Sequence, residues 1–221
     1  DFTHPPVDQS AGVRPLDPHS SNAITRDDMH RYAIIGFGSL LWDLDTLRPQ
    51  VVGPWEYYTG PALPLEFSLV SQKRNHALAL DIDLEHGTPC PTCIIKSQRN
   101  TVAEAVIDLA ARERAPIKII GFYDRDSGNG RSHAESILKR IRNWVESSPW
   151  DGAVWTDGAS NFRTVTGIEF SVAGACEYLR SLSDASLVEA KRYIENAPDR
   201  VDTPLRRALA QDSWWRNLPS R

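Results

Sequence analysis

The hydrophobic pattern of this chain changes along its length, from the alternation of β-strands to the spacing of helices. The clearest alternation lies in HALALDIDLE (76–85), with Leu and Ile on one face of an extended chain and Ala and acidic residues on the other. Shorter segments predict strands at 32–35, 65–71, 93–96 and 118–123. Because most helical spacing comes later and no regular β-α-β repeat appears, we expect an α+β fold.

Two predicted helices carry capping signals at their N-termini. Thr101 and Glu104 match the pattern in which each side chain bonds the other's backbone amide, and the helical spacing then runs to Glu113. Ser132 and Glu135 repeat this pattern before a second apolar stripe. We therefore expect one helix to end at Glu113 and another to begin at Ser132.

The chain divides into three predicted parts. Residues 1–29 are rich in Pro, Ser and Asp without an apolar period, which predicts a flexible N-terminal arm. Residues 30–170 hold the predicted strands and the first helices, and we expect them to form one α+β domain. Residues 171–221 are predicted to pack on that domain as a helical extension, with helices at 171–182, 186–196 and 203–210.

The amino-acid composition limits the kinds of molecule that this protein is expected to bind. The 221 residues carry a formal charge of −4, which argues against a surface that binds nucleic acid. The sequence has no apolar run of the roughly 20 residues that a membrane span needs, and no signal segment at its start. Its three cysteines are a poor disulfide framework and favour a reducing cytoplasm. We expect a cytoplasmic protein that binds a small molecule, and the sequence does not indicate an oligomeric state.

Glu113 is the most informative single residue. It continues the apolar stripe of Val102, Val106 and Leu109 on the inward face of its helix. It also lies in the last turn, where the helix dipole disfavours a negative charge. An inward-facing carboxylate in an unfavourable place is a candidate general base. The alternatives are an ion pair with Arg112 or Arg114 and a solvated helix end.

The segment IIGFGSLLW (34–42) places a Gly-Phe-Gly-Ser loop directly after a buried strand. Glycines let a ligand approach the backbone, and successive free N–H groups hold a carboxylate or an oxyanion. The third glycine of a dinucleotide-binding loop is missing. A tight turn after a core strand explains the same residues, so the loop alone leaves both interpretations open.

His86, Cys90 and Cys93 form an H-x3-C-x2-C pattern that fits a zinc or redox module. A zinc site needs a fourth ligand, and a redox pair of the thioredoxin type begins a helix, whereas this pair leads into a predicted strand. Two buried thiols in a proline-rich hairpin are the simpler interpretation.

Three segments together resemble one family. IIGFGSLLW (34–42), FSLVSQKRN (67–75) and LAARERAP (109–116) are similar in order and spacing to motifs of the γ-glutamylcyclotransferase-like superfamily, and most similar to its ChaC-type branch. The resemblance covers residues 31–123. It implies a mixed, partly closed β-sheet or barrel of about five to seven strands with flanking helices.

The resemblance also implies an activity. The enzyme would convert a γ-glutamyl amine or peptide to 5-oxoproline and the free amine, with Glu113 taking a proton from the α-amine before that amine attacks the γ-carbonyl. No metal or cofactor is required. The guanidinium of Arg74 would suit a substrate carboxylate. Residues implied to line the pocket are Phe37, Gly38, Ser39, Leu40 and Leu41.

Two departures from the family pattern affect these expectations. Phe37 stands where the family usually has Tyr, and residues after 124 do not match the ChaC-type pattern. The leaving-group specificity is therefore open. A non-catalytic protein that binds a γ-glutamyl-like or carboxylate ligand in the same pocket is the alternative function.

Overall fold

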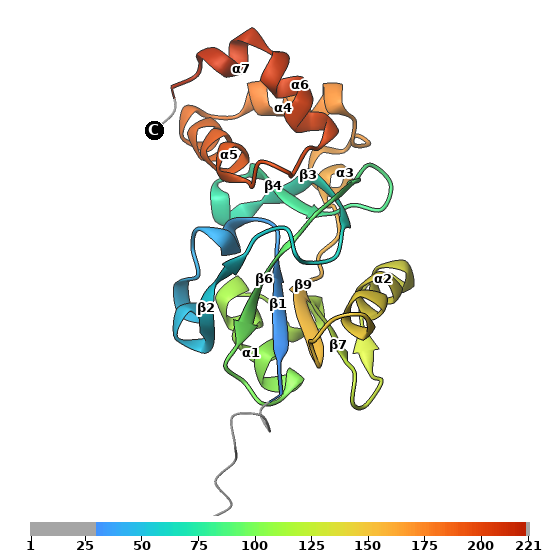
Figure 1. Cartoon of the computed structure of the whole chain (residues 1–221). Coiled ribbons are helices and arrows are strands. Elements are labelled where there is room, and N and C mark those ends of the chain that lie inside the picture. The colour runs from blue at the N-terminus through green and yellow to red at the C-terminus, as the bar shows by residue number, and fades with distance from the viewer. Residues whose placement is uncertain (1–29, 220–221) are drawn as a thin grey trace, which may run out of the picture.

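A computed structural model describes residues 30–219 as an α+β protein with two β-sheets (Figure 1). The larger sheet has six strands in the order β2-β6-β1-β9-β7-β8, and the smaller has three in the order β4-β3-β5. The strands of the larger sheet are β1 (Tyr32–Gly36), β2 (Val51–Glu56), β6 (Cys93–Ser97), β7 (Ile120–Asp124), β8 (Gly130–Arg131) and β9 (Gly152–Thr156). Those of the smaller sheet are β3 (Leu63–Ser71), β4 (Ala77–Ile82) and β5 (Thr88–Cys90).

Strand β1 is the centre of the larger sheet and is buried along its whole length. It runs antiparallel to β6 and parallel to β9, so that Ile34 lies between Ile95 and Val154. Apolar residues on both faces of β1 agree with a strand covered from both sides. This strand delivers the Gly-Phe-Gly-Ser loop to the end of the sheet.

Helices cover both faces of the larger sheet. Helix α1 (Val102–Glu113) shares one apolar cluster with Ile34, and helix α2 (Glu135–Glu146) shares another with Ala33 and Ile35. The Thr101 hydroxyl accepts a hydrogen bond from the Glu104 amide and caps α1, as the sequence predicts. The α1 helix ends where the backbone turns left-handed, so Glu113 is its last residue.

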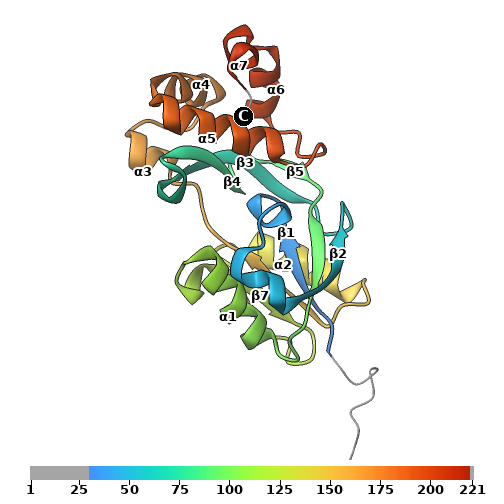
Figure 2. The same cartoon turned by 90° about the vertical axis from the view of Figure 1, so that its left-hand side faces the viewer.

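The smaller sheet carries the C-terminal helices on its outer side (Figures 1 and 2). After β9 the chain crosses to this sheet, where the Asn161 side chain bonds both backbone groups of Val70. Helix α5 packs on β4 and helix α6 on β3, within a core that α2 also joins. The helices here are α3 (Phe162–Thr166), α4 (Val172–Ser181), α5 (Asp184–Asn196), α6 (Pro204–Gln211) and α7 (Ser213–Asn217).

Short 3-10 segments connect the strands. They are η2 (Ser39–Leu41), η3 (Asp45–Gln50), η4 (Gln72–Arg74) and η5 (Ile117–Ile119). η2 directly follows the Gly-Phe-Gly-Ser loop and η4 directly follows β3, so both lie at the ends of strands that reach the same side of the molecule. Across residues 30–219 no helix is long and apolar enough to cross a bilayer.

The α+β class and the three main C-terminal helices are confirmed. The partly closed barrel is wrong: among the residues that the structure describes, the strands form two open sheets. Alternation in a sequence identifies strands but not their partners, and β3 pairs with β4 and β5 instead of joining β1. The predicted arm at 1–29 lies outside the described residues, and the 30–170 and 171–221 boundary stays a prediction.

The predicted cap at Ser132 is wrong. Helix α2 begins after Ala134 without a side-chain cap, because the Ser132 hydroxyl instead donates to Asp157 at 2.8 Å. A capping signal in a sequence does not show whether a nearby carboxylate competes for the hydroxyl.

A buried carboxylate ties the C-terminal helices to the smaller sheet. Glu66 on β3 is fully buried, and its two oxygens accept hydrogen bonds from the amides of Phe67 and, in the first turn of α6, Leu205. A negative charge at a helix N-terminus is favourable, and buried amides need an acceptor.

We expect Glu66→Ala to lower the free energy of unfolding by about 1–3 kcal/mol, because two buried amides lose their acceptor. Urea unfolding at neutral pH measures this change. Glu56→Ala, which removes an exposed glutamate from β2, is the control. Equal unfolding midpoints for the two variants would contradict the role given to Glu66.

Candidate active site

A cavity of about 680 Å³ opens where the two sheets meet. Its walls come from the loop after β1, the end of β3 with η4, strand β4, the C-terminus of α1 and helix α5. A volume of this size accommodates a small organic ligand. Six of the seven residues implied as a site by sequence resemblance line it: Phe37, Gly38, Ser39, Leu40, Arg74 and Glu113.

The glycines of the Gly-Phe-Gly-Ser loop leave room for two aromatic rings. A Cβ atom on Gly36 would lie 2.6 Å from the Trp55 ring, and one on Gly38 would lie 2.5 Å from the Tyr193 hydroxyl. The loop then turns into η2, where the Gly38 carbonyl accepts a hydrogen bond from the Leu41 amide at 3.0 Å. Packing therefore requires both glycines, and the second also brings the Tyr193 hydroxyl against the backbone at the cavity wall.

Glu113 reaches the cavity with one oxygen held and the other free. Its side chain is 18% exposed, and Oε1 accepts a hydrogen bond from Arg112 at 2.7 Å. The Thr156 hydroxyl lies 3.4 Å from the same oxygen. No residue within the described part of the chain donates to Oε2. An ion pair with Arg112 was one of the alternatives to a functional role for Glu113, and it is present. The carboxylate nevertheless lines the cavity.

Arg112 fastens the end of α1 to the loop after β1. Its side chain is 6% exposed. Besides Glu113 it contacts the Ser39 hydroxyl at 3.2 Å and the Asp43 carbonyl at 2.6 Å. One buried guanidinium thus fixes the Glu113 carboxylate relative to the loop, and its planar fork suits three such acceptors.

Arg74 and Lys73 differ in whether their charged groups already have partners within the protein. The Arg74 guanidinium donates to Glu189 at 2.9 Å and lies over the Tyr193 ring at 4.8 Å. Lys73 lines the same cavity, and no described residue forms a hydrogen bond or ion pair with its ammonium. Burial lowers the pKa of Lys73, while the charge of Glu113 acts in the opposite direction.

Asp81 on β4 is a second carboxylate in the cavity wall. It is 2% exposed; its Oδ1 accepts a hydrogen bond from the Ile82 amide, and its Oδ2 has no partner among residues 30–219. Burial raises the pKa of Asp81 to about 7. Asp81 is not among the site residues predicted from the sequence, although an acid between Leu80 and Ile82 in a predicted strand is a usable signal.

A hydrogen-bonded pair lies behind Asp81. His133 contacts Asp157 at 3.0 Å, and the Trp155 indole and the Ser132 hydroxyl donate to the same carboxylate. Burial acts to raise the pKa of Asp157, but these hydrogen bonds outweigh it and hold that pKa below its usual value. The hydrogen bond to Asp157 raises the pKa of His133. This pair therefore has its partners in place, in contrast to Asp81.

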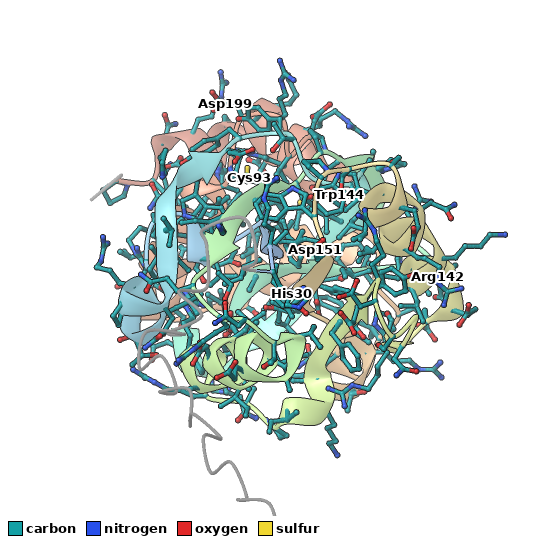
Figure 3. All side chains as sticks on the ribbon, turned by 60° about the horizontal axis from the view of Figure 1, so that its bottom comes forward. His30, Cys93, Arg142, Trp144, Asp151 and Asp199 are labelled. Carbon is teal, nitrogen blue, oxygen red and sulfur yellow. The ribbon has the colours of Figure 1, made fainter. Side chains whose placement is uncertain are left out.

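The cysteine motif forms no ligand cluster. Cys90 and Cys93 are free, buried thiols, and burial raises the pKa of both; Figure 3 labels Cys93 among the packed side chains. His86 contacts Asp83 at 3.5 Å. Within the part of the chain that the structure describes, no three His, Cys, Asp or Glu residues are grouped as metal ligands. These thiols act as core residues here.

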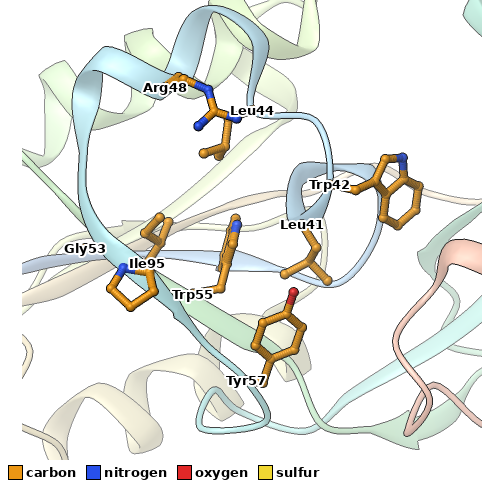
Figure 4. A pocket seen from close by; sticks show the side chains of 9 residues that line it. Leu41, Trp42, Leu44, Arg48, Gly53, Trp55, Tyr57 and Ile95 are labelled. Atoms are coloured by element: carbon orange, nitrogen blue, oxygen red, sulfur yellow. The ribbon is translucent and has the colours of Figure 1, made fainter.

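Leu41, the remaining predicted site residue, faces a different cavity. This second cavity, of about 370 Å³, lies between η2, η3 and β2 (Figure 4). The Trp55 indole lies at its centre and also packs against Gly36. Leu40 lines the larger cavity and Leu41 this one, so η2 contributes to both. The sequence could not predict this because consecutive residues of a 3-10 turn point in different directions.

Comparison with sequence models of protein families, with curated proteins and with solved structures found no match to this chain.

Removing the Asp81 charge should stabilise the protein at high pH. Between the ordinary aspartate pKa of 3.8 and the folded value of about 7, the folded state holds a proton that the unfolded state lacks. Stability from this group therefore falls as pH rises through that window. We expect Asp81→Asn to gain on the order of 4 kcal/mol relative to wild type between pH 4 and pH 8.

Urea unfolding of both proteins across this pH range measures the difference. Subtracting the two curves removes most of the contribution of His133 and Asp157. The remaining difference comes from Asp81 itself and from the loss of its charge acting on His133. A difference that does not change with pH would show that Asp81 titrates normally.

Proposed function

We propose that this protein is a γ-glutamylcyclotransferase-like enzyme, which converts a γ-glutamyl amine or peptide to 5-oxoproline and the free amine. One observation carries the proposal: Glu113 at the end of α1 and the Gly38–Leu40 backbone after β1 line the same cavity, although they are distant in sequence. The shared cavity supports the functional interpretation of the loop over that of a simple turn.

The charges of the cavity suit a zwitterionic substrate. A γ-glutamyl group carries an α-ammonium and an α-carboxylate a few bonds apart. The carboxylate of Glu113, the carboxyl group of Asp81 and the unpaired ammonium of Lys73 line the cavity. Complementary charges of both signs in a partly buried site favour binding of such a group over that of a simple anion.

Glu113 acts as the base in this mechanism. Its Oε2 takes a proton from the substrate ammonium, because an ammonium has no lone pair with which to attack. Arg112 holds Oε1 and so fixes the direction of the free oxygen. The amine then attacks the γ-carbonyl of the same molecule, and holding the substrate in a folded shape in the cavity supplies much of the rate.

The loop after β1 faces the other side of the substrate. The backbone N–H of Gly38 stabilises negative charge on the carbonyl oxygen as the ring closes. The Ser39 amide already interacts with the Tyr193 hydroxyl. Arg112 holds Ser39 through its hydroxyl, so the base and the loop move as one unit. No metal ion or cofactor takes part in these steps.

Lys73 is the better partner for the substrate α-carboxylate. Arg74 already pairs with Glu189 and stacks on Tyr193, so its guanidinium positions the aromatic wall. The Lys73 ammonium has no competing partner within residues 30–219 and lies close enough to Glu113 for their charges to interact. We assign Lys73 to carboxylate binding and Arg74 to positioning Tyr193.

Glu113→Gln should lower the rate of 5-oxoproline release by about 10²–10⁴-fold, because an amide cannot accept the proton. The assay measures 5-oxoproline from a panel of γ-glutamyl amines and peptides. Glu135→Gln, at an exposed position in α2, should keep the wild-type rate. Release by the variant at the wild-type rate would overturn the role of Glu113, and binding of γ-glutamyl compounds by wild type without release would indicate a binding protein.

Lys73→Gln should raise KM about tenfold with a smaller effect on kcat, since a charge-assisted hydrogen bond to a partly exposed group contributes about 1.5 kcal/mol. Lys73→Arg should restore part of the affinity. Lys139→Gln on the exposed face of α2 is the control. An unchanged KM in Lys73→Gln, together with a raised KM in Arg74→Gln, would show that Arg74 binds the substrate carboxylate instead of Lys73.

A further inference from the structure

Asp81 has the geometry of a group that meets a ligand. Asp81 lines the larger cavity, and its buried Oδ2 has no hydrogen-bond partner in the described part of the chain. Gly158 lines the same wall, and a Cβ atom there would lie 2.8 Å from Oδ2. The glycine thus keeps space beside an oxygen whose hydrogen-bonding capacity is unused, which is an unfavourable arrangement for a purely structural carboxylate.

The groups around Asp81 do not neutralise it. His133, just before α2, is hydrogen-bonded to Asp157, and the Oδ1 atom of Asp83 accepts hydrogen bonds from the amides of Glu85 and His86. Burial raises the pKa of Asp81 to about 7; His133 opposes this shift, and the charges of Asp157 and Asp83 add to it. Near neutral pH this carboxyl group both holds and releases a proton.

The proposed reaction also requires a proton on the leaving nitrogen. When the ring nitrogen has attacked the γ-carbon, the bond to the leaving nitrogen breaks only if that nitrogen is protonated, because an amide anion is a very poor leaving group. Glu113 is ion-paired with Arg112 and faces the attacking amine, so it serves the other end of the reaction. Two carboxyl groups with different environments divide acid and base roles in this way.

We propose that Asp81 is the general acid of this site and delivers a proton from its carboxyl group to the leaving nitrogen. The assignment rests on the proposed function. The ring nitrogen–carbon bond forms while the carbon–leaving-nitrogen bond breaks, and Asp81 becomes a carboxylate. The ammonium loses two protons, one to Glu113 and one that reloads Asp81. The Glu113 proton then leaves on the product amine, so that both carboxyl groups return to their starting states.

The test compares two leaving groups in the full-length protein. A γ-glutamyl alkylamide releases a strongly basic amine that needs the acid, whereas γ-glutamyl p-nitroanilide releases a weakly basic amine that does not. We expect Asp81→Asn to lower kcat for the alkylamide by about 10²–10⁴-fold and kcat for the nitroanilide by less than about tenfold. For the alkylamide, the high-pH limb of the kcat profile near pH 7 should disappear in the variant.

Asp83→Asn is the matched control, because Asp83 is a buried carboxylate next to β4 that also has an unpartnered Oδ2 but does not line the cavity. It should keep the leaving-group dependence of wild type. Equal losses for both substrates in Asp81→Asn, or no loss for either, would overturn the assignment while leaving the proposed function intact. Failure of wild type to release 5-oxoproline from either substrate would overturn the proposed function and the assignment together.

Discussion

The candidate site depends on one buried guanidinium. Arg112 lies at the end of α1 and reaches Glu113, the Ser39 hydroxyl and the Asp43 carbonyl. Burying a charge is costly unless it is paired and hydrogen-bonded, and these three acceptors meet most of that requirement. The Nε–H of Arg112 has no partner among residues 30–219. Helix α1 packs on one face of β1, and the loop extends from the end of the same strand. Because Arg112 joins the end of α1 to this loop, it fixes the distance between the Glu113 carboxylate and the loop.

The second constraint is that the smaller sheet and its helices complete the cavity. Tyr193 on α5 lies against Gly38, stacks edge-on with Trp42 at 5.4 Å and lies under Arg74. A hydroxyl therefore reaches the loop from the C-terminal helices, although Phe37 lacks one. Residues after 124, which do not match the ChaC-type pattern, thus contribute Tyr193 to the wall of the cavity. In the proposed reaction they would shape the space for the leaving group.

Glu113 and the loop could be predicted from the sequence as site candidates because both break a local rule: an acid continues an apolar stripe, and two glycines follow a buried strand. The structure places both at one cavity. Asp81 is missed because the alternation of its strand suggests a solvated polar face, whereas β4 is buried on both sides. The resemblance places Leu41 with Leu40, from which the 3-10 turn separates it. Arg74 matched a motif, but only the fold shows that Glu189 uses its charge.

The two carboxyl groups of the cavity lie in environments that suit the opposite proton-transfer roles we propose for them. Glu113 lies against a guanidinium, so its negative charge has a partner before any substrate arrives. Asp81 lies in an apolar strand with one free oxygen, so burial opposes its charge and destabilises the folded protein at high pH. Replacing Asp81 with an uncharged residue of the same shape would therefore raise the stability of the protein at high pH. Because this destabilising carboxyl group lines the same cavity as the proposed base, we assign it a chemical role instead of a structural one.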